Sequence, residues 1–300
     1  MDSKIKVSDV IDRLRTASGS SWVDKPWDGL QTGSLDADVT GIAIVWSPGL
    51  QLLREAVTKG CNLILAKDPV YWYEKEEPRK SVDSSSSRIS EGIAGGLRWD
   101  AVEKTETYRI KKEFIESNKL NIYRISENWD GQPSRETAGF LQALGWKADQ
   151  LLSVEPLNPN KQTAIVTVPQ QDLMPLAKAV KGRLNGKSAR LIGDSSAKVK
   201  KVAVHPAYLT VAAATKIGQI PGVDLIVTGE SCEWEAFVYT EDWITAGHGK
   251  GFLMVGLAVA SDTAANAVGD WVRKTVSGAK VETLHAGDPM IAVNAGRLRA

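Results

Sequence analysis

Several charged side chains fall directly after apolar segments that have the length and composition of buried strands. Lys67 and Asp68 follow the apolar segment 63–66, and Glu230 follows the segment 225–229. An apolar run that stops at a charged residue is typical of a parallel strand that reaches a ligand cleft, since ligands bind outside the carboxyl ends of such strands. We therefore expect Asp68 and Glu230 to supply acid or base chemistry at this cleft.

Further polar and aromatic residues fall at or just beyond the same predicted strand ends. The predicted ligand-contacting residues are Lys67, Tyr71, Ser126, Glu127, Asn128, Trp129, Asp130, Glu233 and Ser261. Several carboxylates that converge on one crevice either hold a hard cation or divide acid and base roles. The alternative is that they are solvated residues, because strand ends are exposed. Lys67 favours a metal-free pocket, because its ammonium group can neutralise Asp68.

The sequence lacks the common catalytic and nucleotide-binding motifs. It has no phosphate-binding loop, no glycine-rich dinucleotide fingerprint, no nucleophile elbow and no pair of closely spaced cysteines. The three histidines, His205, His248 and His285, are not paired at ligand spacing, which argues against an ordinary zinc site. We expect the lone His205 to be a packed or surface residue. Cys61 and Cys232 are expected to be small core residues, with a disulfide as the alternative.

Alternating strand and helix signals position these residues. In the first half, the expected elements are a helix over 7–15 with Ser8 as N-cap, a loop over 17–38, a strand over 39–46, a helix over 48–59, a strand over 63–66, a helix over 107–117 and a strand over 120–125. The order strand, helix, strand, with a crossover of this length, is typical of parallel sheets.

The same order returns in the second half. There we expect strands over 162–168, 199–205, 225–227 and 251–256, and helices over 172–184, 208–217 and 234–245, the first of which is followed by the segment 189–192. The sequence thus predicts an α/β fold of two duplicated βαβ-containing halves, 1–156 and 157–300, packed around a shared cleft with a hinge near 156–161. A serine-rich insertion over 76–99 is interpreted as a solvated loop, with a lid as the alternative.

Composition excludes several classes of partner. Lys plus Arg is 37 and Asp plus Glu is 36, so no overall field attracts nucleic acid or an anionic membrane. No apolar stretch approaches the roughly 20 residues that span a bilayer. The first ten residues lack the apolar core of a signal peptide, so we expect a soluble protein that is either cytoplasmic or exported, with its leader absent from the present sequence.

Four segments carry a resemblance to a known family. The segments 38–43, 59–69, 227–230 and 286–289 resemble the Nif-three-like dinuclear metal-centre family, which is also labelled GTP cyclohydrolase type two. Segments such as 139–146 and 233–235 resemble a branch of it that is often made with an export leader. The resemblance implies a duplicated α/β fold, a homo-oligomer that is usually a toroidal hexamer, two metal ions per cleft and hydrolase activity.

The metal ligands of that family do not carry over to this chain. Lys67 and Asp68 stand where the family has a histidine followed by histidine or glutamate. The family's histidine-rich cluster falls on Ser126, Glu127, Asn128 and Asp130, and its last histidine and glutamate fall on Leu257 and Ser261. The resemblance leaves Asp68, Asp130 and Glu230 as metal-capable residues, which disfavours zinc and iron. We expect no cofactor, or at most one Mg²⁺, Mn²⁺ or Ca²⁺.

Three functions are compatible with these observations. The first is a small-molecule-binding or otherwise diverged protein whose dinuclear metal site is degenerate. The second is a metal-dependent hydrolase that acts on a small phosphoester, nucleotide or amide through the remaining carboxylates. The third is an inactive structural paralogue within an oligomer.

Overall fold

The structure is a computed structural model that describes residues 5–72, 102–131, 134–154 and 161–291. The chain divides into two compact units: unit 1 holds residues 1–129 and 269–284, and unit 2 holds residues 130–268 and 285–300. The predicted insertion over 76–99 and most of the predicted hinge lie outside the described residues. Unit 2 begins at Asp130, and the segment 269–284 returns to unit 1.

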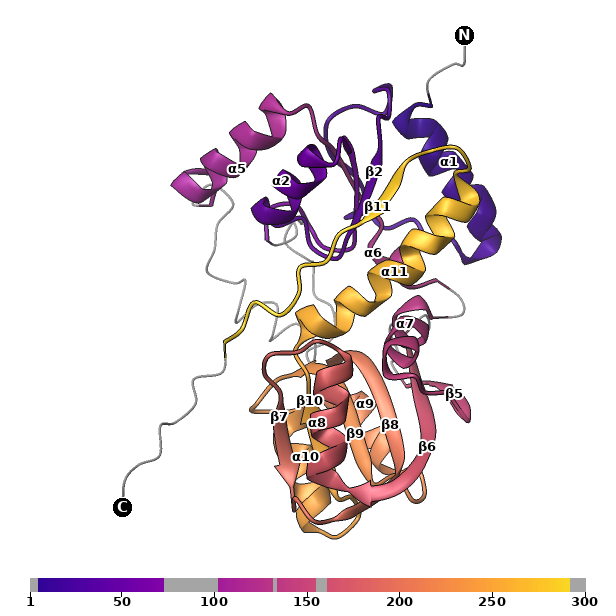
Figure 1. Ribbon diagram of the computed structural model, residues 1–300, viewed down its shortest axis with the longest axis vertical. Helices are drawn as coiled ribbons and strands as arrows, with labels where there is room; N and C mark the ends of the chain where they lie inside the picture. The colour runs from indigo at the N-terminus through magenta and orange to yellow at the C-terminus, as the bar shows by residue number, and fades with distance from the viewer. Residues whose placement is uncertain (1–4, 73–101, 132–133, 155–160, 292–300) are drawn as a thin grey trace. The chain divides into compact units, whose positions relative to one another are not determined.

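Unit 1 contains a five-stranded sheet of strand order β1-β4-β3-β2-β11 (Figure 1). Its strands are β1 (Gly29–Thr32), β2 (Ile42–Val45), β3 (Leu63–Ala66), β4 (Asn121–Arg124) and β11 (Val281–Thr283). Neighbouring strands are parallel except for β1, which is antiparallel to β4. Its helical elements are α1 (Val7–Ser18), the 3₁₀ turn η1 (Gly19–Ser21), α2 (Leu50–Thr58), α5 (Glu106–Ser117) and most of α6 (Ser126–Asp130).

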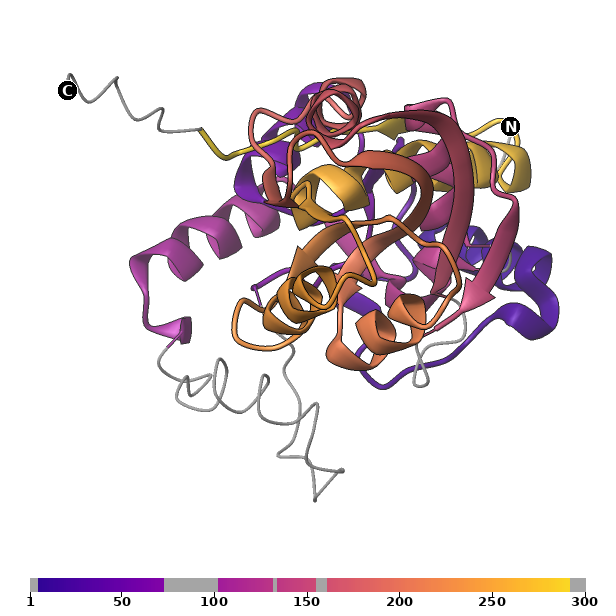
Figure 2. The ribbon, with the colours of Figure 1, turned by 90° about the horizontal axis from the view of Figure 1, so that it is seen from below.

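Helices cover both faces of this sheet, which is why its central strands are apolar throughout rather than alternating with polar residues. Ala43 and Ile64 pack with Leu53 of α2 and Ile115 of α5 in one core cluster. The intervening strand residues, such as Ile44, point to the opposite face and are also fully buried. Helix α1 lies on that side of the sheet (Figures 1 and 2).

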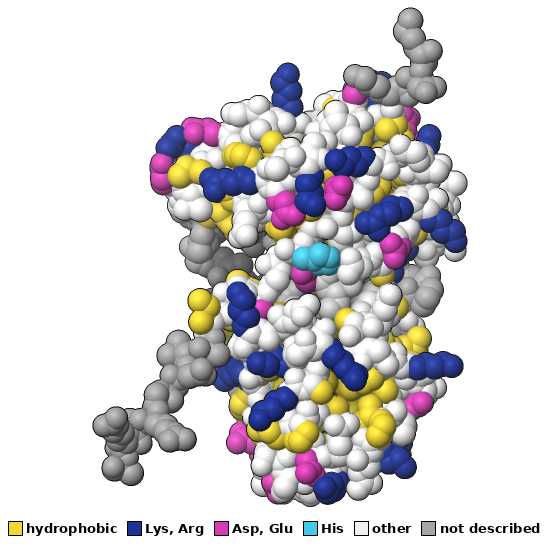
Figure 3. Space-filling model, viewed as in Figure 1, with side chains coloured by type: hydrophobic (Ala, Val, Ile, Leu, Met, Phe, Trp, Pro, Cys, Tyr) yellow, Lys and Arg dark blue, Asp and Glu magenta, His cyan; other side chains and the backbone are white. Residues whose placement is uncertain are grey.

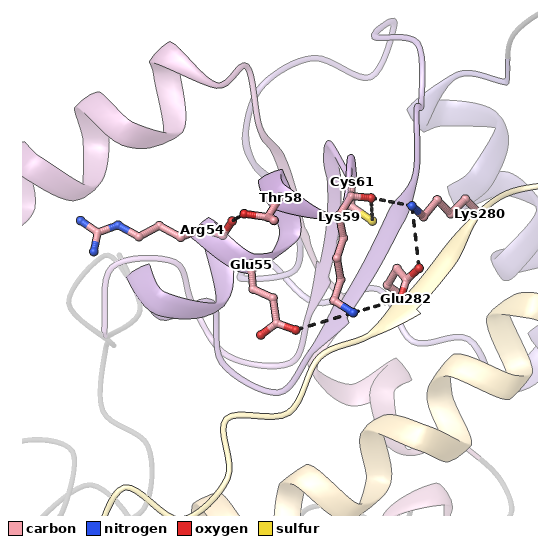
Figure 4. A network of polar contacts seen from close by, with 7 residues as sticks. All are labelled: Arg54, Glu55, Thr58, Lys59, Cys61, Lys280 and Glu282. Atoms are coloured by element: carbon pink, nitrogen blue, oxygen red, sulfur yellow. Dashed lines mark hydrogen bonds and ion pairs between the residues drawn. The ribbon is translucent and has the colours of Figure 1, made fainter.

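A network of polar contacts holds the edge strand β11 at the amino ends of the strands (Figure 4). The Nζ of Lys280 donates to the carbonyl of Lys59 at 2.7 Å, and the Nζ of Lys59 lies 3.5 Å from Glu282 and 3.8 Å from Glu55. Cys61 lies beside the network and is buried. Ion pairs this exposed add at most about 1 kcal/mol, so the network fixes the position of β11 more than it stabilises the unit.

Unit 2 contains a six-stranded sheet of order β5-β6-β8-β9-β10-β7. Its strands are β5 (Gln150–Ser153), β6 (Gln162–Asp172), β7 (Arg190–Gly193), β8 (Lys198–Leu209), β9 (Leu225–Ser231) and β10 (Gly251–Met254). Its helices are α7 (Arg135–Leu144), α8 (Leu173–Arg183), α9 (Val211–Gly218) and α10 (Ala236–Thr245), and α11 (Leu257–Thr275) belongs to it up to Val268. Residues of α7, α8 and α11 share one core cluster with the sheet, and residues of α9 and α10 share another.

The two sheets repeat one plan, which confirms the predicted duplication. In each, three consecutive parallel strands lie side by side in sequence order: β2, β3 and β4 in unit 1, and β8, β9 and β10 in unit 2. In each, the third of these strands pairs with an antiparallel edge strand, β1 or β7. The chain therefore has the α/β fold of two βαβ-containing halves that the sequence predicts.

Two local predictions are wrong, and one segment for which no element was predicted is helical. Helix α1 has Lys6 rather than Ser8 as its N-cap, because the amides of Val7 and Ser8 already donate to carbonyls of the segment 35–37. Tyr208 lies in β8 rather than in the following helix, since β8 continues past a register irregularity to Leu209. The segment 257–261 is helical, because Gly256 adopts φ +95° and turns the chain directly from β10 into α11.

The surface mixes charges of both signs. On the face shown in Figure 3, basic and acidic side chains are interspersed over each unit, in keeping with a net charge of +1. Among the described helices, none is both long enough and apolar enough to cross a membrane.

Candidate functional site

The carboxyl edge of the unit 1 sheet brings the residues that follow β3 beside those that follow β4. The carbonyl of Trp46, just after β2, accepts the amides of Lys67 at 3.1 Å and Asp68 at 3.0 Å. On the other side of β3, the amide of Ile125 donates to the carbonyl of Ala66 at 2.9 Å. The predicted residues Lys67 and Asp68 therefore leave the sheet next to the segment that begins α6.

A buried arginine fixes this edge. Arg124 is 6% exposed, and its Nε donates to the carbonyl of Lys67 at 3.0 Å, while its Nη1 donates to the carbonyl of Trp27 at 3.5 Å. A planar guanidinium that bonds two separate backbone segments holds both in a defined geometry. The main chain of Lys67 is thus hydrogen-bonded both to Trp46, which follows β2, and to Arg124 of β4.

Three residues predicted as ligand contacts are engaged within unit 1. Ser126 donates through its amide to Asp28 at 3.1 Å, and its Oγ also donates to Asp28. The side chain of Asn128 accepts from the amide of Val23 at 2.9 Å and donates to its carbonyl at 2.8 Å. Trp129 is fully buried. The side chains of Ser126 and Asn128 anchor the loop before β1 to α6. The partly exposed predicted residues of this edge are Lys67, Asp68, Ser126 and Glu127.

Asp28 is a residue of this edge that sequence reasoning missed. Burial raises the pKa of its carboxyl group, although the hydrogen bond from Ser126 and the charge of Arg124 act in the opposite direction. Asp28 lies in the predicted loop over 17–38, where no hydrophobic pattern marks a structured segment. The Asp-Gly pair that it forms with Gly29 is a turn signal, and it is the only local indication of its position.

The carboxyl edge of the unit 2 sheet is tightly packed around Gly229 and presents Glu230 to solvent. The Oγ1 of Thr228 donates to the carbonyl of Ala207 at 2.9 Å. A Cβ at Gly229 would lie 3.1 Å from that carbonyl oxygen and from the Cβ of Ala260, so β8, β9 and α11 approach closely there. Glu230 is exposed at the point where β9 leaves this packing.

The other predicted residues of unit 2 differ from one another in environment. Glu233 forms an ion pair with Arg190 of β7, and the hydrogen bond and charge of Arg190 lower the pKa of Glu233. Ser261 is fully buried in α11, and its Oγ has no hydrogen-bond partner among the described residues. Asp130 is 4% exposed and belongs to a buried polar cluster at the start of α7.

That cluster gathers side chains around the N-terminus of α7 and the end of β8. The carboxylate Oδ1 of Asp130 accepts from the Oγ of Ser134 at 2.7 Å and from the amide of Glu136 at 3.0 Å. Ser134 caps α7, and Thr137 donates to the carbonyl of Gln162 at 2.6 Å. A carboxylate at a helix N-terminus is favoured by the free amides and the helix dipole.

His205 is the titratable residue of β8 that reaches this cluster, and it is completely buried. Its Nδ1 lies 2.9 Å from the hydroxyl of Thr163, and its Nε2 lies 3.2 Å from the carbonyl of Tyr208. Because a carbonyl can only accept, Nε2 carries the proton of the neutral ring. The expectation of a packed histidine is confirmed, whereas the buried Glu136 beside it was not foreseen.

The resemblance segment 286–289 has a structural role in unit 2. The carboxylate of Asp262 accepts the amides of Ala286 and Gly287, each at 3.3 Å. Asp288 accepts the amides of Lys187 at 2.7 Å and Ser188 at 3.1 Å. Burial acts to raise the pKa of Asp288, but its hydrogen bonds from backbone amides dominate and lower it.

A buried lysine, Lys111 of α5, lies behind Tyr71. It is 3% exposed, donates to the carbonyl of Val70, and sits 5.9 Å from the ring centre of Tyr71 and 5.2 Å from that of Trp72. No described carboxylate pairs with it. Burial lowers the pKa of Lys111 to about 8.

Replacing Lys111 by methionine should raise the free energy of unfolding by about 1 kcal/mol at pH 7, since the desolvation of the ammonium outweighs the lost hydrogen bond and ring contacts. The folded state disfavours the charged lysine, so this gain should shrink as the pH rises from about 8 towards 10.5. Urea unfolding at pH 7 and pH 10 measures both effects. The exposed helical Lys178 provides the control, and a Lys111→Met variant no more stable than Lys178→Met would contradict this account.

The expectation of a degenerate metal site concerns three residues of the chain, Asp68, Asp130 and Glu230. Asp68 lies in unit 1, whereas Asp130 and Glu230 lie in unit 2. Within either unit, no three His, Cys, Asp or Glu side chains of the described residues converge as metal ligands would. Lys67 places a cation next to Asp68 in the sequence, and each of Asp68, Asp130 and Glu230 offers oxygen ligands but no imidazole.

Comparison with known proteins gives the following matches. The family model of Duf34/NIF3 (NGG1p interacting factor 3) matches residues 5–99 and 96–250. The hypothetical protein SA1388 of Staphylococcus aureus superposes with a TM-score of 0.70 at 16% identity, covering 97% of this chain and 100% of that one. A Bacillus cereus protein related to NIF3 gives 0.69 at 15% identity, with coverage of 97% and 100%.

A third solved structure, reduced HcgD from Methanocaldococcus jannaschii, gives a TM-score of 0.63 at 12% identity, covering 94% of this chain and 98% of that one. No protein with a curated description matches the sequence significantly. Identities this low establish a common fold over the whole chain and leave the activity to be argued from the residues.

Proposed function

This chain belongs to the Duf34/NIF3 family, and we propose that it is a small-molecule-binding member whose dinuclear metal site has degenerated. The observation that carries the proposal is the built carboxyl edge of the unit 1 sheet. There the main chain at Lys67 and Asp68 is fixed by Trp46 and by the buried Arg124, while both side chains remain partly exposed. A site for recognition needs such a rigid frame beneath accessible polar groups.

The charges of this edge favour an ammonium-based pocket over a metal-based one. Lys67 supplies a positively charged donor group, and Asp68 and Glu127 supply carboxylates on adjacent strand ends. A ligand with both acidic and hydrogen-bonding groups matches this arrangement. In unit 2, the exposed Glu230 occupies the corresponding end of β9, and we propose it as a second acid–base residue alongside Asp68.

The proposal is tested first by elemental analysis and native mass of protein purified without a metal-chelating step. We expect no stoichiometric metal and a homo-oligomer. Near-stoichiometric Mg²⁺, Mn²⁺ or Ca²⁺, together with metal-dependent turnover of phosphoesters or nucleotides that Asp68→Ala abolishes, would overturn the proposal in favour of a hydrolase.

A thermal-shift screen of small anionic metabolites then tests the site itself. For any compound that raises the melting temperature, Lys67→Met and Asp68→Asn should each weaken binding by about tenfold, as expected when one charge-assisted hydrogen bond is lost. Lys216→Met, which removes an exposed lysine of α9, is the matched control and should bind normally. If all three variants bound the compound equally well, the carboxyl edge of the unit 1 sheet would not be its binding site.

A further inference from the structure

Unit 1 holds a groove of about 600 Å³ between α5 and the segment 31–37. Its volume lies within the range of roughly 300 to 1,000 Å³ typical of small-molecule sites. Of the residues that follow the strand ends, Tyr71 lines this groove. Lys67, Asp68 and Glu127 do not line it, so the groove is separate from the proposed carboxyl-edge site.

One end of the groove is aromatic. Tyr71 and Tyr108 both line it, with their ring centres 4.4 Å apart and their planes inclined by 40°. Behind them, Trp72 meets Tyr71 edge-on at 6.3 Å, and the buried Lys111 lies below both rings. Trp72 adopts φ +69°, which is uncommon for a residue with a side chain, and it is 51% exposed.

The other end carries positive charge. Lys112, Glu116 and Lys119 line the groove where α5 ends. Lys112 and Glu116 lie one helical turn apart, with Nζ and Oε1 separated by 3.9 Å. Lys119 forms no ion pair with any described residue, and the groove therefore retains an ammonium group whose charge is not compensated locally.

The wall opposite α5 is rigid. The amide of Ser34 donates to Oδ1 of Asn121 at 2.9 Å, and the hydroxyl of Thr32 donates to the carbonyl of Leu120 at 3.1 Å. Gly33 adopts φ +89°, and a Cβ there would lie only 2.2 Å from Oδ1 of Asn121. A side chain at this position would push the wall off β4, so glycine allows the close approach that shapes the groove.

We propose that this groove binds a flat aromatic acid, with its ring against Tyr71 and Tyr108 and its carboxylate near Lys119. The tyrosine pair offers an apolar face with the quadrupole that favours aromatic partners. An anion near Lys119 gains a charge-assisted contact that no described side chain supplies. The proposal goes beyond the function proposed above and depends on different residues.

The test is isothermal titration of the 300-residue chain with 1-naphthoate, 1-naphthalenemethanol and cyclohexanecarboxylate. We expect 1-naphthoate to bind, and the neutral alcohol and the non-aromatic acid each to bind about tenfold more weakly, because each lacks one of the two contacts. Lys119→Gln should weaken 1-naphthoate binding by about tenfold and leave the affinity for the alcohol unchanged. Equal affinities for 1-naphthoate and the alcohol would overturn the proposal.

Two further variants test whether 1-naphthoate binds in this groove. Ala37→Phe places a ring into the groove from the wall and should abolish 1-naphthoate binding, while Tyr108→Leu removes the stacking face and should weaken it. Lys67→Met and Lys216→Met should bind 1-naphthoate normally, so a failure of the carboxyl-edge proposal is distinguishable from a failure of this one. Undiminished binding to a folded Ala37→Phe variant would show that the acid binds elsewhere.

Discussion

Replacing Gly139 by alanine should lower the free energy of unfolding by about 2 kcal/mol, an effect opposite in sign to the usual gain from glycine to alanine in a helix. Gly139 lies in the middle of α7. A Cβ there would lie 2.6 Å from the carbonyl oxygen of Thr263 and 3.1 Å from the Cα of Ala264, both in α11. These are backbone atoms, so no side chain can rotate away to make room.

The expected sign of the change in the free energy of unfolding follows from comparing two contributions, the helix propensity of alanine and the cost of overpacking. Removing a glycine from a helix interior contributes roughly 1 kcal/mol of stability, because glycine loses more backbone freedom on folding. Overpacking a closely packed interior costs about 1 to 3 kcal/mol, and here the cost falls at the upper end, because either α7 or α11 must shift as a whole. The buried Phe140 beside Gly139 would move with the helix. The packing term therefore outweighs the helix term.

Gly182 of α8 is the matched control. A Cβ at Gly182 meets nothing within 4 Å, so Gly182→Ala should raise the free energy of unfolding by about 0.5 to 1 kcal/mol. Urea denaturation of the two variants beside the parent protein measures the difference directly. If Gly139→Ala were as stable as Gly182→Ala, α7 and α11 would not approach through this glycine.

The central strands were the part of the fold that could be predicted from the sequence. Segments such as 63–66 and 225–227 are continuous apolar runs, because helices cover both faces of their sheets, and such runs need no knowledge of distant contacts. The duplication was visible for the same reason, since apolar positions and the charged exits recur.

The outer strands β1 and β11 could not be predicted, because their stability comes from distant partners. Strand β11 is three residues long and contains Glu282, so it has no pattern of its own. It forms because β2, far away in the sequence, offers a parallel edge, and Ile42 donates its amide to the carbonyl of Lys280 at 2.8 Å. Strand β1 likewise forms against β4 within a segment that the sequence indicates as a loop.

The candidate site likewise contains some residues whose positions could be predicted from the sequence and others whose positions could not. The positions of Lys67, Asp68 and Glu230 follow from where the apolar runs end, and the structure places each at the carboxyl end of its strand. The engagement of Ser126 and Asn128 by the loop before β1 could not be foreseen, because it depends on partners about a hundred residues away in the sequence. Glu136 was missed because a glutamate in the first turn of a helix is normally solvated.

Lowering the pH from 7 to 4 should destabilise the protein through His205 by about 3 kcal/mol, in addition to any common effect of its carboxylates. Burial and the nearby charge of Lys161 lower the pKa of His205 from 6.5 to about 4, although the hydrogen bond to the carbonyl of Tyr208 and the charge of Glu136 act the other way. Between about pH 6.5 and pH 4 the unfolded chain binds a proton at His205 and the folded chain does not. Acid therefore favours unfolding over this interval, and no further loss from His205 is expected below about pH 4.

The hydrogen bonds of the ring explain why protonation is resisted. Nε2 donates to the carbonyl of Tyr208, so Nδ1 accepts from the hydroxyl of Thr163 in the neutral state. Adding a proton at Nδ1 forces that hydroxyl to turn and places a charge in a completely buried position. The folded protein therefore keeps the neutral ring until the pH is well below that at which a free histidine is protonated.

His205→Gln and the exposed control His248→Gln distinguish this contribution from the acid response of the whole protein. Each variant and the parent are unfolded by urea at intervals between pH 7 and pH 4. The parent and His248→Gln should lose stability along parallel curves, whereas His205→Gln, although less stable at pH 7, should lose about 3 kcal/mol less over the interval. Parallel curves for all three proteins would mean that His205 is protonated in the folded state at its ordinary pKa, and the polar cluster at the start of α7 would then have to accommodate a charged imidazole.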